Sequence, residues 1–439
     1  MPRTRKKRPN WPYRLTWLVI CFLLGSYLTT QTILTGLSHR HRSYGVDWPM
    51  AFIAGCLDTI FAIWFVTVGA CIGSFLNVVA YRVPLGRYVG GHSGCPYCGT
   101  PIDSLDNIPV LAWIKLRGRC RTCRLPISIQ YPLVEFAVAA VFFVVFVSEF
   151  ATNGANLPMN TANSAGLGGL VRINLTPTLV LRTVSYLVVL SGLIAAALIA
   201  VKGGRVPLKL YIWTLIPHCV VSLCLPKTSV APWQSNLAAL GPIDERLQIA
   251  ASLMAGLAAG TALGRLLVPV LFPGYDRTLV ASDPSSRSAR QFVGALAVLG
   301  CTLGWQWTVA GTWCVVACGL LCVLFLRGSK RLSVGDLTVW VWLGFLLFRA
   351  NWSFIARIPS PFETWPEIVR QILGALMLAP ICIAYRLQAP TLGISDTHKE
   401  PHEMDVENTP PTLFTEELAC QNENLPPSQS HSAPPHPLQ

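Results

Sequence analysis

The chain has 439 residues, of which 52 % are apolar and only 13 % are charged, and its formal net charge is +13. So few charges over so much apolar surface exclude an ordinary soluble domain and indicate a protein that crosses a membrane many times. The positive charge then reflects topology and contact with the lipid bilayer. We expect no nucleic acid partner, because no soluble stretch carries a basic patch interleaved with aromatic residues.

Long apolar runs follow one another along the chain and predict an all-α polytopic membrane protein with about ten transmembrane helices. The runs lie at 16–37, 55–80, 132–150, 178–201, 208–224, 247–272, 291–310, 311–327, 335–350 and 367–386. Only Gly311 separates the seventh run from the eighth.

Basic residues indicate the orientation, because loops rich in Lys and Arg stay in the cytoplasm. They gather in the first fourteen residues, around the cysteine pairs described below, at 202–209 and at 327–331. Alternating the runs from a cytoplasmic N-terminus places all of these segments on the cytoplasmic side, although two arginines between the first two runs do not fit. The tail after about 391 is rich in Pro, Ser, Asn, Glu and His, which predicts a disordered cytoplasmic segment.

These features divide the chain into four predicted parts. They are a basic N-terminus with an extra anchor helix (1–54), a second helix with a cysteine module (55–136, the module itself at 92–126), a multi-helix membrane domain (132–387) and the tail (388–439). The first apolar run is too long for the core of a cleaved signal peptide, so we expect a retained anchor.

Two CxxC pairs, Cys95 with Cys98 and Cys120 with Cys123, lie between the second and third runs. Two such pairs about twenty residues apart are typical of a structural zinc site with four thiolate ligands. A pair of redox motifs is the alternative, but a redox CxxC usually occurs once, on a thioredoxin-like pattern. A closed site of four cysteines leaves no open position for water or substrate, so the metal is expected to have a structural role.

The segment around these cysteines resembles the N-terminal half of the bacterial type IV prepilin peptidases. The resemblance is carried by GACIGSFLNVVAYRVPLG (69–86) and by CPYCGTPIDSLDNIPVLAWIKLRGRCRTCRLPISIQYPLVEF (95–136). It implies a multi-pass protein of the bacterial inner membrane that cleaves the leaders of type IV prepilins or of the related pseudopilins of type II secretion. Some members also N-methylate the new terminus with S-adenosylmethionine.

The resemblance further implies an intramembrane aspartic peptidase, in which two carboxyl groups share a proton to activate water and protonate the leaving group. In the segment LIAAALIAVKGGRVPLKLYIWTLIP (193–217), the position of the first aspartate is occupied by Ala200. For the second, ALAVLGCTLGWQW (295–307) resembles the stretch just after the family's second aspartate, which places Phe292 at that position. In another register, Gly335-Asp336 resembles the family's Gly-Asp pair, and Asp336 is then the candidate catalytic acid.

Other polar residues in the resembling segment have two interpretations each. Asn77, Arg82 and Glu135 are candidates for substrate binding, but polar contacts at helix ends explain Asn77 and Arg82 as well, and Glu135 is a possible partner for an arginine. Gly73 is expected to let two helices approach closely. Asp106 is expected to cap a turn, and Trp113 to anchor the module at the level of the lipid headgroups.

Three functions remain open from the sequence. The chain is a working prepilin peptidase with a relocated pair of acids, or a degenerate member that binds pilins or assists assembly. The third possibility is that it retains only the transfer of a methyl group from S-adenosylmethionine, for which no glycine-rich nucleotide fingerprint is present.

Overall fold

The computed structural model describes residues 11–40, 48–91, 93–95, 97–152, 154, 156–157, 176–229, 242–272, 275, 283–325, 338–357 and 366–388. Its helices belong to one compact unit, Met1–Leu392. The second unit, Gly393–Gln439, and the predicted tail from 389 onward lie outside the described residues. So do the first ten residues of the basic N-terminus.

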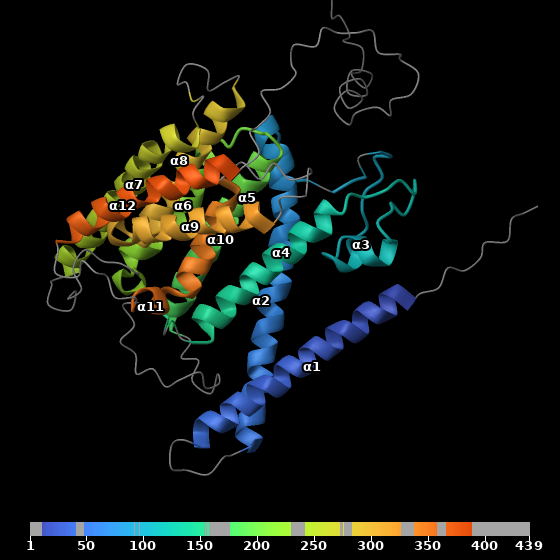
Figure 1. Ribbon diagram of the computed structural model, residues 1–439. Helices are drawn as coiled ribbons and strands as arrows, with labels where there is room; N and C mark the ends of the chain where they lie inside the picture. Colours follow the sequence, from blue (N-terminus) through green and yellow to red (C-terminus); the bar gives the residue numbers. More distant parts are fainter. Residues whose placement is uncertain are drawn as a thin grey trace, which may run out of the picture. The chain divides into compact units, whose positions relative to one another are not determined.

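The described residues are helical, as expected, and contain no strand (Figure 1). The α-helices are α1 (Trp11–Arg40), α2 (Trp48–Arg82), α3 (Leu111–Leu116), α4 (Gln130–Val145), α5 (Pro177–Val201), α6 (Leu208–Cys224), α7 (Pro242–Leu271), α8 (Pro284–Leu303), α9 (Trp305–Phe325), α10 (Thr338–Ala350), α11 (Trp352–Ile355) and α12 (Glu367–Gln388). A π-helical segment, Phe146–Phe150, continues α4. Each of the ten apolar runs therefore overlaps a helix, and the run 291–310 overlaps both α8 and α9.

Five of these helices are long and apolar enough to cross a membrane. They are Trp48–Leu85, Gln130–Phe150, Pro177–Val201, Glu245–Leu271 and Trp305–Cys322, and three shorter apolar helical stretches lie at Leu18–Ile33, Leu208–Cys224 and Thr338–Ala350. Membrane character is therefore evident from the helices.

The boundary between the seventh and eighth helices differs from the predicted one. The chain turns at Gly304, whose φ of 76° suits glycine, and Gly311 lies inside α9. A Cβ at Gly311 would come within 2.6 Å of the Leu303 side chain. The glycine that separates the two apolar runs therefore serves helix packing, and the one seven residues earlier makes the break.

Capping residues in the sequence account for the N-termini of two helices, α5 and α8. The side chain of Thr176 accepts a hydrogen bond from the Leu179 N–H at the start of α5, and Asp283 does the same for the Ser286 N–H at the start of α8. In both helices the next residue is a proline, which suits the first helical position because it has no N–H to leave unpaired.

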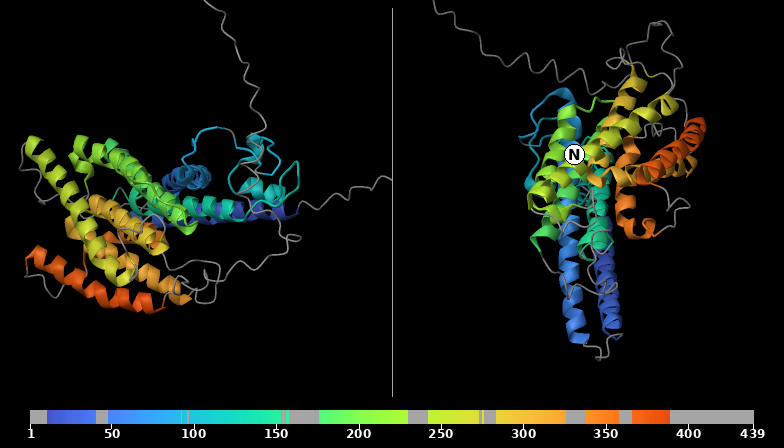
Figure 2. Two further views of the ribbon diagram at one scale, coloured as in Figure 1. Left: turned by 90° about the horizontal axis from the view of Figure 1, so that it is seen from above. Right: turned by 90° about the vertical axis from the view of Figure 1, so that its left-hand side faces the viewer.

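Small residues decide how closely the helices pack. On α7, Gly256 and Gly260 face the backbone of α8, and a Cβ on either would collide with a carbonyl oxygen of Gly300 or Leu296. Glycines four residues apart permit such backbone contact between membrane helices. The interior that results includes fully buried side chains of α4, α5, α8 and α10. Figure 2 shows α1 and α2, the first two helices, side by side in the right-hand view, in line with their mutual contacts.

Candidate metal centre

The four cysteines of the two CxxC pairs meet in one cluster, which we call the Cys₄ cluster (Cys95, Cys98, Cys120 and Cys123). Their Sγ atoms all lie within 4.8 Å of one another, and those of Cys95 and Cys123 are 3.8 Å apart. Zinc bonded tetrahedrally to sulfur at about 2.3 Å implies sulfur atoms about 3.8 Å apart. The donor set therefore fits a single zinc ion, and it has no free position for a substrate.

Each cysteine pair lies on a short loop, and the two loops have the same backbone pattern. In the first loop, Cys95 donates to the Thr100 carbonyl and Gly99 donates back to Cys95. The second loop repeats both bonds, from Cys120 to Leu125 and from Arg124 to Cys120. Isolated bridges, Gly94 with Pro101 and Arg119 with Pro126, close the loops. The sequences CPYCGTP and CRTCRLP thus form a structural repeat that we did not detect in the sequence.

Thr100 also affects the ionisation of the cluster. The Cys98 thiol and the Thr100 hydroxyl lie 3.2 Å apart, and this hydrogen bond is the main cause that lowers the pKa of Cys98 to about 6. A thiol that ionises easily is a better metal ligand, because metals bind the thiolate. Thr100 thus favours the thiolate form of Cys98, whereas burial and the neighbouring thiols raise the pKa of Cys123 to about 11.

A buried carboxylate ties the second loop to the chain between the loops. The side chain of Asp106 is 4 % exposed and pairs with Arg121 and, at 3.7 Å, with Lys115. The bond to Arg121 lowers the pKa of Asp106. The residue lies in a short 3₁₀ turn, Ser104–Asp106, but its side chain pairs with Arg121 and Lys115, a role that we did not predict.

Trp113 is held inside the module, in addition to any role that it has at the lipid surface. Its Nε1 donates to the Ile127 carbonyl at 3.1 Å, and a Cβ at Gly118 would lie 2.7 Å from its ring. Gly118 has a φ of 64°, so its conformation and its close approach both favour glycine. The LRGRC segment of the sequence thus shapes the loop that carries the second cysteine pair.

Glu135 joins the module to the membrane helices. It is 8 % exposed, and its Oε2 accepts the backbone N–H of Val110 at 2.7 Å. Val110 has a φ of 60° and a ψ of −53°, and the Leu111 N–H reaches the Pro109 carbonyl at 2.6 Å around it. This is a γ-turn of the rare, strained type, which persists only where neighbouring groups hold it. Among the described residues no arginine pairs with Glu135; the carboxylate instead holds the turn.

The α2 helix approaches α4 closely at the same level. A Cβ at Gly73 would lie 2.7 Å from the Glu135 Cα, which confirms that Gly73 is required for helix contact. The Ser74 side chain hydrogen-bonds to the Glu135 carboxyl group, and Nδ2 of Asn77 donates to the Tyr131 carbonyl at 3.3 Å. The motif GSFLN thus fixes the start of α4 on α2, with α3 of the module nearby in Figure 1.

Arg82 closes the end of α2. Its Nη1 donates to the carbonyls of Tyr88, Val89 and Gly90, at 3.4, 3.2 and 2.7 Å. Both Asn77 and Arg82 therefore make the polar helix-end contacts that were one of their two interpretations. Whether they also contact a substrate stays a prediction.

The two positions assigned to the aspartate pair lie in two helices, α5 and α8, that are linked to each other. Ala200 is in the last turn of α5, and Phe292 lies in α8, is fully buried and contacts Phe272. Just beyond Ala200, the Gly203 carbonyl accepts from Arg287, and the Gly204 carbonyl accepts from Nε2 of Gln291 at 2.8 Å. The local side chains are thus cationic or amide groups. The third candidate, Asp336, lies outside the described residues.

The helices also contain a buried ion pair that we did not predict from the sequence. Glu149 and Arg349, each 1 % exposed, pair through two hydrogen bonds. Both are charged residues at the ends of apolar runs. A charged residue in such a run is a sequence signal that could have identified them.

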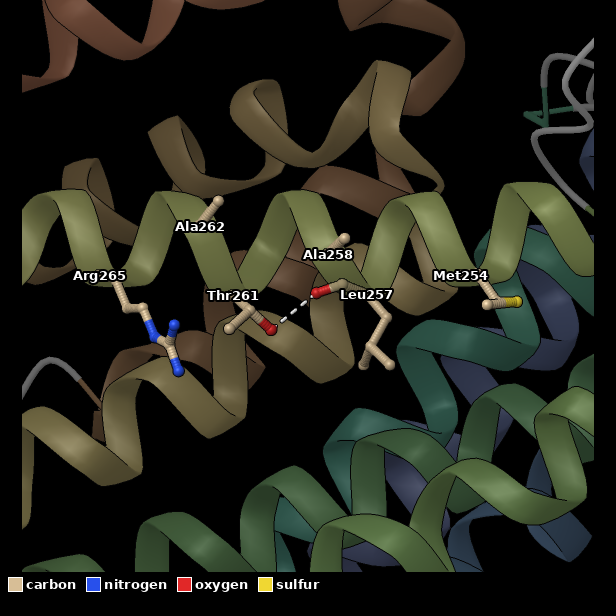
Figure 3. Close-up of a pocket in the computed structure, with 6 residues that line it drawn as sticks. All are labelled: Met254, Leu257, Ala258, Thr261, Ala262 and Arg265. Atoms are coloured by element: carbon tan, nitrogen blue, oxygen red, sulfur yellow. Dashed lines mark hydrogen bonds between the residues drawn. The ribbon is translucent and has the colours of Figure 1, made fainter.

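A shallow pocket of about 380 Å³ lies on α7 (Figure 3). Its lining consists of Met254, Leu257, Ala258, Thr261, Ala262 and Arg265, all from that one helix. The hydroxyl of Thr261 is bonded to the Leu257 carbonyl at 2.8 Å, and Arg265 is the one charged group. The pocket therefore lacks the acids and nucleophiles of a catalytic site.

Residues 67–149 match the family model described as the bacterial peptidase A24 N-terminal domain. Over 92 residues the chain is 47 % identical to the prepilin leader peptidase/N-methyltransferase of Myxococcus xanthus (strain DK1622), which is 21 % of this chain and 28 % of the relative. It is 32 % identical over 140 residues to the protein of the same name from Burkholderia pseudomallei (strain 1026b), with 26 % and 44 % covered.

A type 4 prepilin-like proteins leader peptide-processing enzyme of Escherichia coli O78:H11 (strain H10407 / ETEC) is 40 % identical over 95 residues, 17 % of this chain and 35 % of that protein. The chain thus spans less than half the length of each of these relatives. No solved structure matches it. The matched residues 67–149 contain the Cys₄ cluster, Asn77, Arg82 and Glu135. Residues 67–149 are therefore similar to the N-terminal domain of the bacterial A24 peptidases, and the relatives that share this region are named as prepilin leader peptidases.

Proposed function

We propose that the chain is a member of the prepilin peptidase family that binds type IV prepilins or pseudopilins at the membrane but has lost leader cleavage. The observation that carries the proposal is the chemistry where the end of α5 is linked to α8, since the resemblance places the acids in these two helices. Ala200 and Phe292 occupy these positions, and the groups that bridge them are Arg287 and Gln291.

An aspartic peptidase needs one ionised and one protonated carboxyl group in contact. A methyl group and a phenyl ring can neither accept a proton from water nor donate one to a leaving amine. Arg287, which is bonded to the Gly203 carbonyl, offers hydrogen-bond donors and no acceptor. None of the four side chains of Ala200, Phe292, Arg287 and Gln291 is therefore suited to general acid or base chemistry.

The family's N-terminal domain, in contrast, retains its internal contacts. The Cys₄ cluster, the Asp106 ion pair and the bond between Glu135 and Val110 together form a rigid module on the end of α2 and α4. A module that is built so completely, beside a site without acids, supports a role in binding a partner. Zinc would hold the two cysteine loops together there.

The positions of the parts in the cell belong to the same proposal. The protein would lie in the bacterial inner membrane with ten spans, one for each helix that overlaps an apolar run. The N-terminus, the Cys₄ cluster and the tail would be cytoplasmic, as the distribution of basic residues favours. The module would then meet the part of a prepilin that precedes its membrane helix.

Methyl transfer is a second candidate, favoured by the name N-methyltransferase that several relatives bear. It requires no pair of acids, so Ala200 and Phe292 do not oppose it. S-adenosylmethionine would supply the methyl group, and a purified chain that methylates a pre-cleaved pilin terminus would establish this function.

The test is a membrane assay in which a type IV prepilin is co-expressed with the chain. We expect co-purification of uncleaved prepilin with the native chain, and cleavage only after the double replacement Ala200→Asp and Phe292→Asp. Cleavage by the native chain that Asp336→Asn abolishes would instead identify a peptidase with a relocated acid. Absence of co-purification and of cleavage would contradict the binding role.

A further inference from the structure

A group of polar side chains surrounds the buried ion pair of Glu149 and Arg349. The Cζ atom of Arg349 lies 3.8 Å from the centre of the Tyr186 ring, a cation–π contact, and Nη2 lies 3.0 Å from Oε2 of Glu149. The backbone carbonyl of Arg349 accepts from Nδ2 of Asn156 at 2.9 Å. The group therefore has a fixed architecture contributed by α5, α10 and the π-helical end of α4.

The charges in this group do not cancel. Arg182 of α5 interacts electrostatically with both Arg349 and Glu149. Among the residues that the structure describes here, two guanidinium groups thus act on one carboxylate in a region bounded by apolar helices. An unbalanced charge in such surroundings is costly unless a counter-charge is supplied.

Unpartnered hydrogen-bonding atoms accompany the excess charge. They are Nε of Arg182, Oγ1 of Thr183, the Tyr186 hydroxyl and Nδ1 of His218. Thr183, Tyr186 and His218 are 2, 1 and 5 % exposed, and His218 also senses the charge of Arg349. Each of the four groups can donate a hydrogen bond. Buried groups of this kind are normally satisfied, so an occupant that accepts hydrogen bonds would complete them.

The depth of the group indicates the source of the occupant. Arg182 lies five residues after Pro177, which starts α5, so its Cα is about 8 Å from that helix end. Glu149 and Arg349 lie in the last turns of their own segments. Phosphate groups of lipids lie at the level of such helix ends. Arginine with hydroxyl donors is a donor set suited to phosphate.

We propose that Arg182, Thr183, Tyr186 and His218 form a binding site for the phosphate of an anionic phospholipid, whose negative charge balances the extra arginine. The bound headgroup would hold α5, α6, α10 and the end of α4 together. The site is at the end of α4 remote from the Cys₄ cluster and does not depend on the function proposed above.

The experiment uses the full chain, purified and stripped of lipid, with native mass spectrometry and thermal unfolding as readouts. We expect phosphatidylglycerol to bind and to raise the unfolding temperature, and phosphatidylcholine to do so much less. Arg182→Gln should weaken the binding of phosphatidylglycerol at least tenfold, because it removes a charge-assisted hydrogen bond. Thr183→Val should weaken it about threefold, because it removes a neutral hydrogen bond. Arg265→Gln, which removes an exposed arginine from α7, is the matched control and should have little effect.

Equal binding of the two lipids, or equal losses in Arg182→Gln and Arg265→Gln, would overturn the proposal. Inorganic phosphate added alone tests the source of the ligand. Protection by inorganic phosphate that depends on Arg182, without any by the lipid, would show a free anion site and overturn the lipid assignment. If Arg182→Gln does not fold, Thr183→Val decides, because it changes one hydroxyl and no charge.

Discussion

The Glu135 carboxylate in α4 accepts the backbone N–H of Val110 at 2.7 Å, and Val110 is the strained centre of a γ-turn in the cysteine module. One side chain thus joins a membrane helix to the module and stabilises a backbone conformation that a β-branched residue rarely adopts.

Replacement of Glu135 should therefore loosen the module. We expect Glu135→Ala to lower the free energy of unfolding by about 2 kcal/mol, the usual loss for a hydrogen bond to a charged group. Glu135→Gln retains an oxygen that accepts the Val110 N–H and should recover most of the loss. Thermal unfolding and limited proteolysis of residues 93–127 would measure both. Equal stability of the alanine variant and the native chain would contradict the role.

The Cys₄ cluster should bind about one zinc ion per chain. Cys98→Ser removes one ligand, so metal analysis of the purified variant should show loss of zinc or a module that unfolds. Cys71→Ser, which changes an exposed cysteine of α2, is the matched control and should retain the metal. Two disulfides and no zinc in a folded native sample would refute the site.

The contact of α2 with α4 should not tolerate a larger residue at Gly73. A methyl group there meets the Glu135 Cα, part of the backbone that cannot move aside easily, so Gly73→Ala should cost roughly 1–3 kcal/mol. Gly25→Ala in α1 meets no atom within 4 Å and is the control. Thermal unfolding in detergent compares the two variants, and similar midpoints would show that α2 and α4 are less tightly packed.

The two cysteine loops should respond oppositely to exchange at their equivalent positions. Gly99 and Arg124 have φ values of 65° and 64°. Gly99→Ala should cost about 1 kcal/mol through the backbone alone, because its Cβ would meet no neighbour, while Arg124→Gly should cost nothing measurable. Zinc retention against a chelator would report both, and a larger loss for Arg124→Gly would refute the equivalence of the loops.

Asp106 should make the module sensitive to acid. Arg121 lowers the pKa of Asp106 in the folded chain, so the stabilisation is present above the carboxyl pKa of the unfolded chain, about 3.9, and is lost as the pH falls through the lower folded value. The stability difference between the native chain and Asp106→Asn should therefore be constant at neutral pH and shrink below about pH 4. Unfolding titrations of the two proteins measure it. A difference that grows on acidification would exclude this ion pair as the cause.

The sequence predicted the helices well because a bilayer requires long apolar runs, and each run overlaps a helix. The predicted break between α8 and α9 was at Gly311, but the chain turns at Gly304. The sequence alone does not distinguish these two glycines, because only the packing of the helices determines which one lies at the turn. The spacing of the cysteines was sufficient to predict which four residues form the candidate metal centre. The contact between Glu135 and Val110 could not be predicted, because its donor is a backbone group in an unusual conformation. The pair of Glu149 and Arg349 joins residues 200 positions apart, and no local pattern connects them.

The π-helical segment Phe146–Phe150 means that the aim of Glu149 depends on the number of residues before it as well as on its identity. Each residue of an α-helix turns the next side chain by about 100°. If the same five residues wound as an ordinary α-helix, Glu149 would turn away from Arg349. The wider π winding thus absorbs one extra residue and keeps the carboxylate directed at its arginine partner.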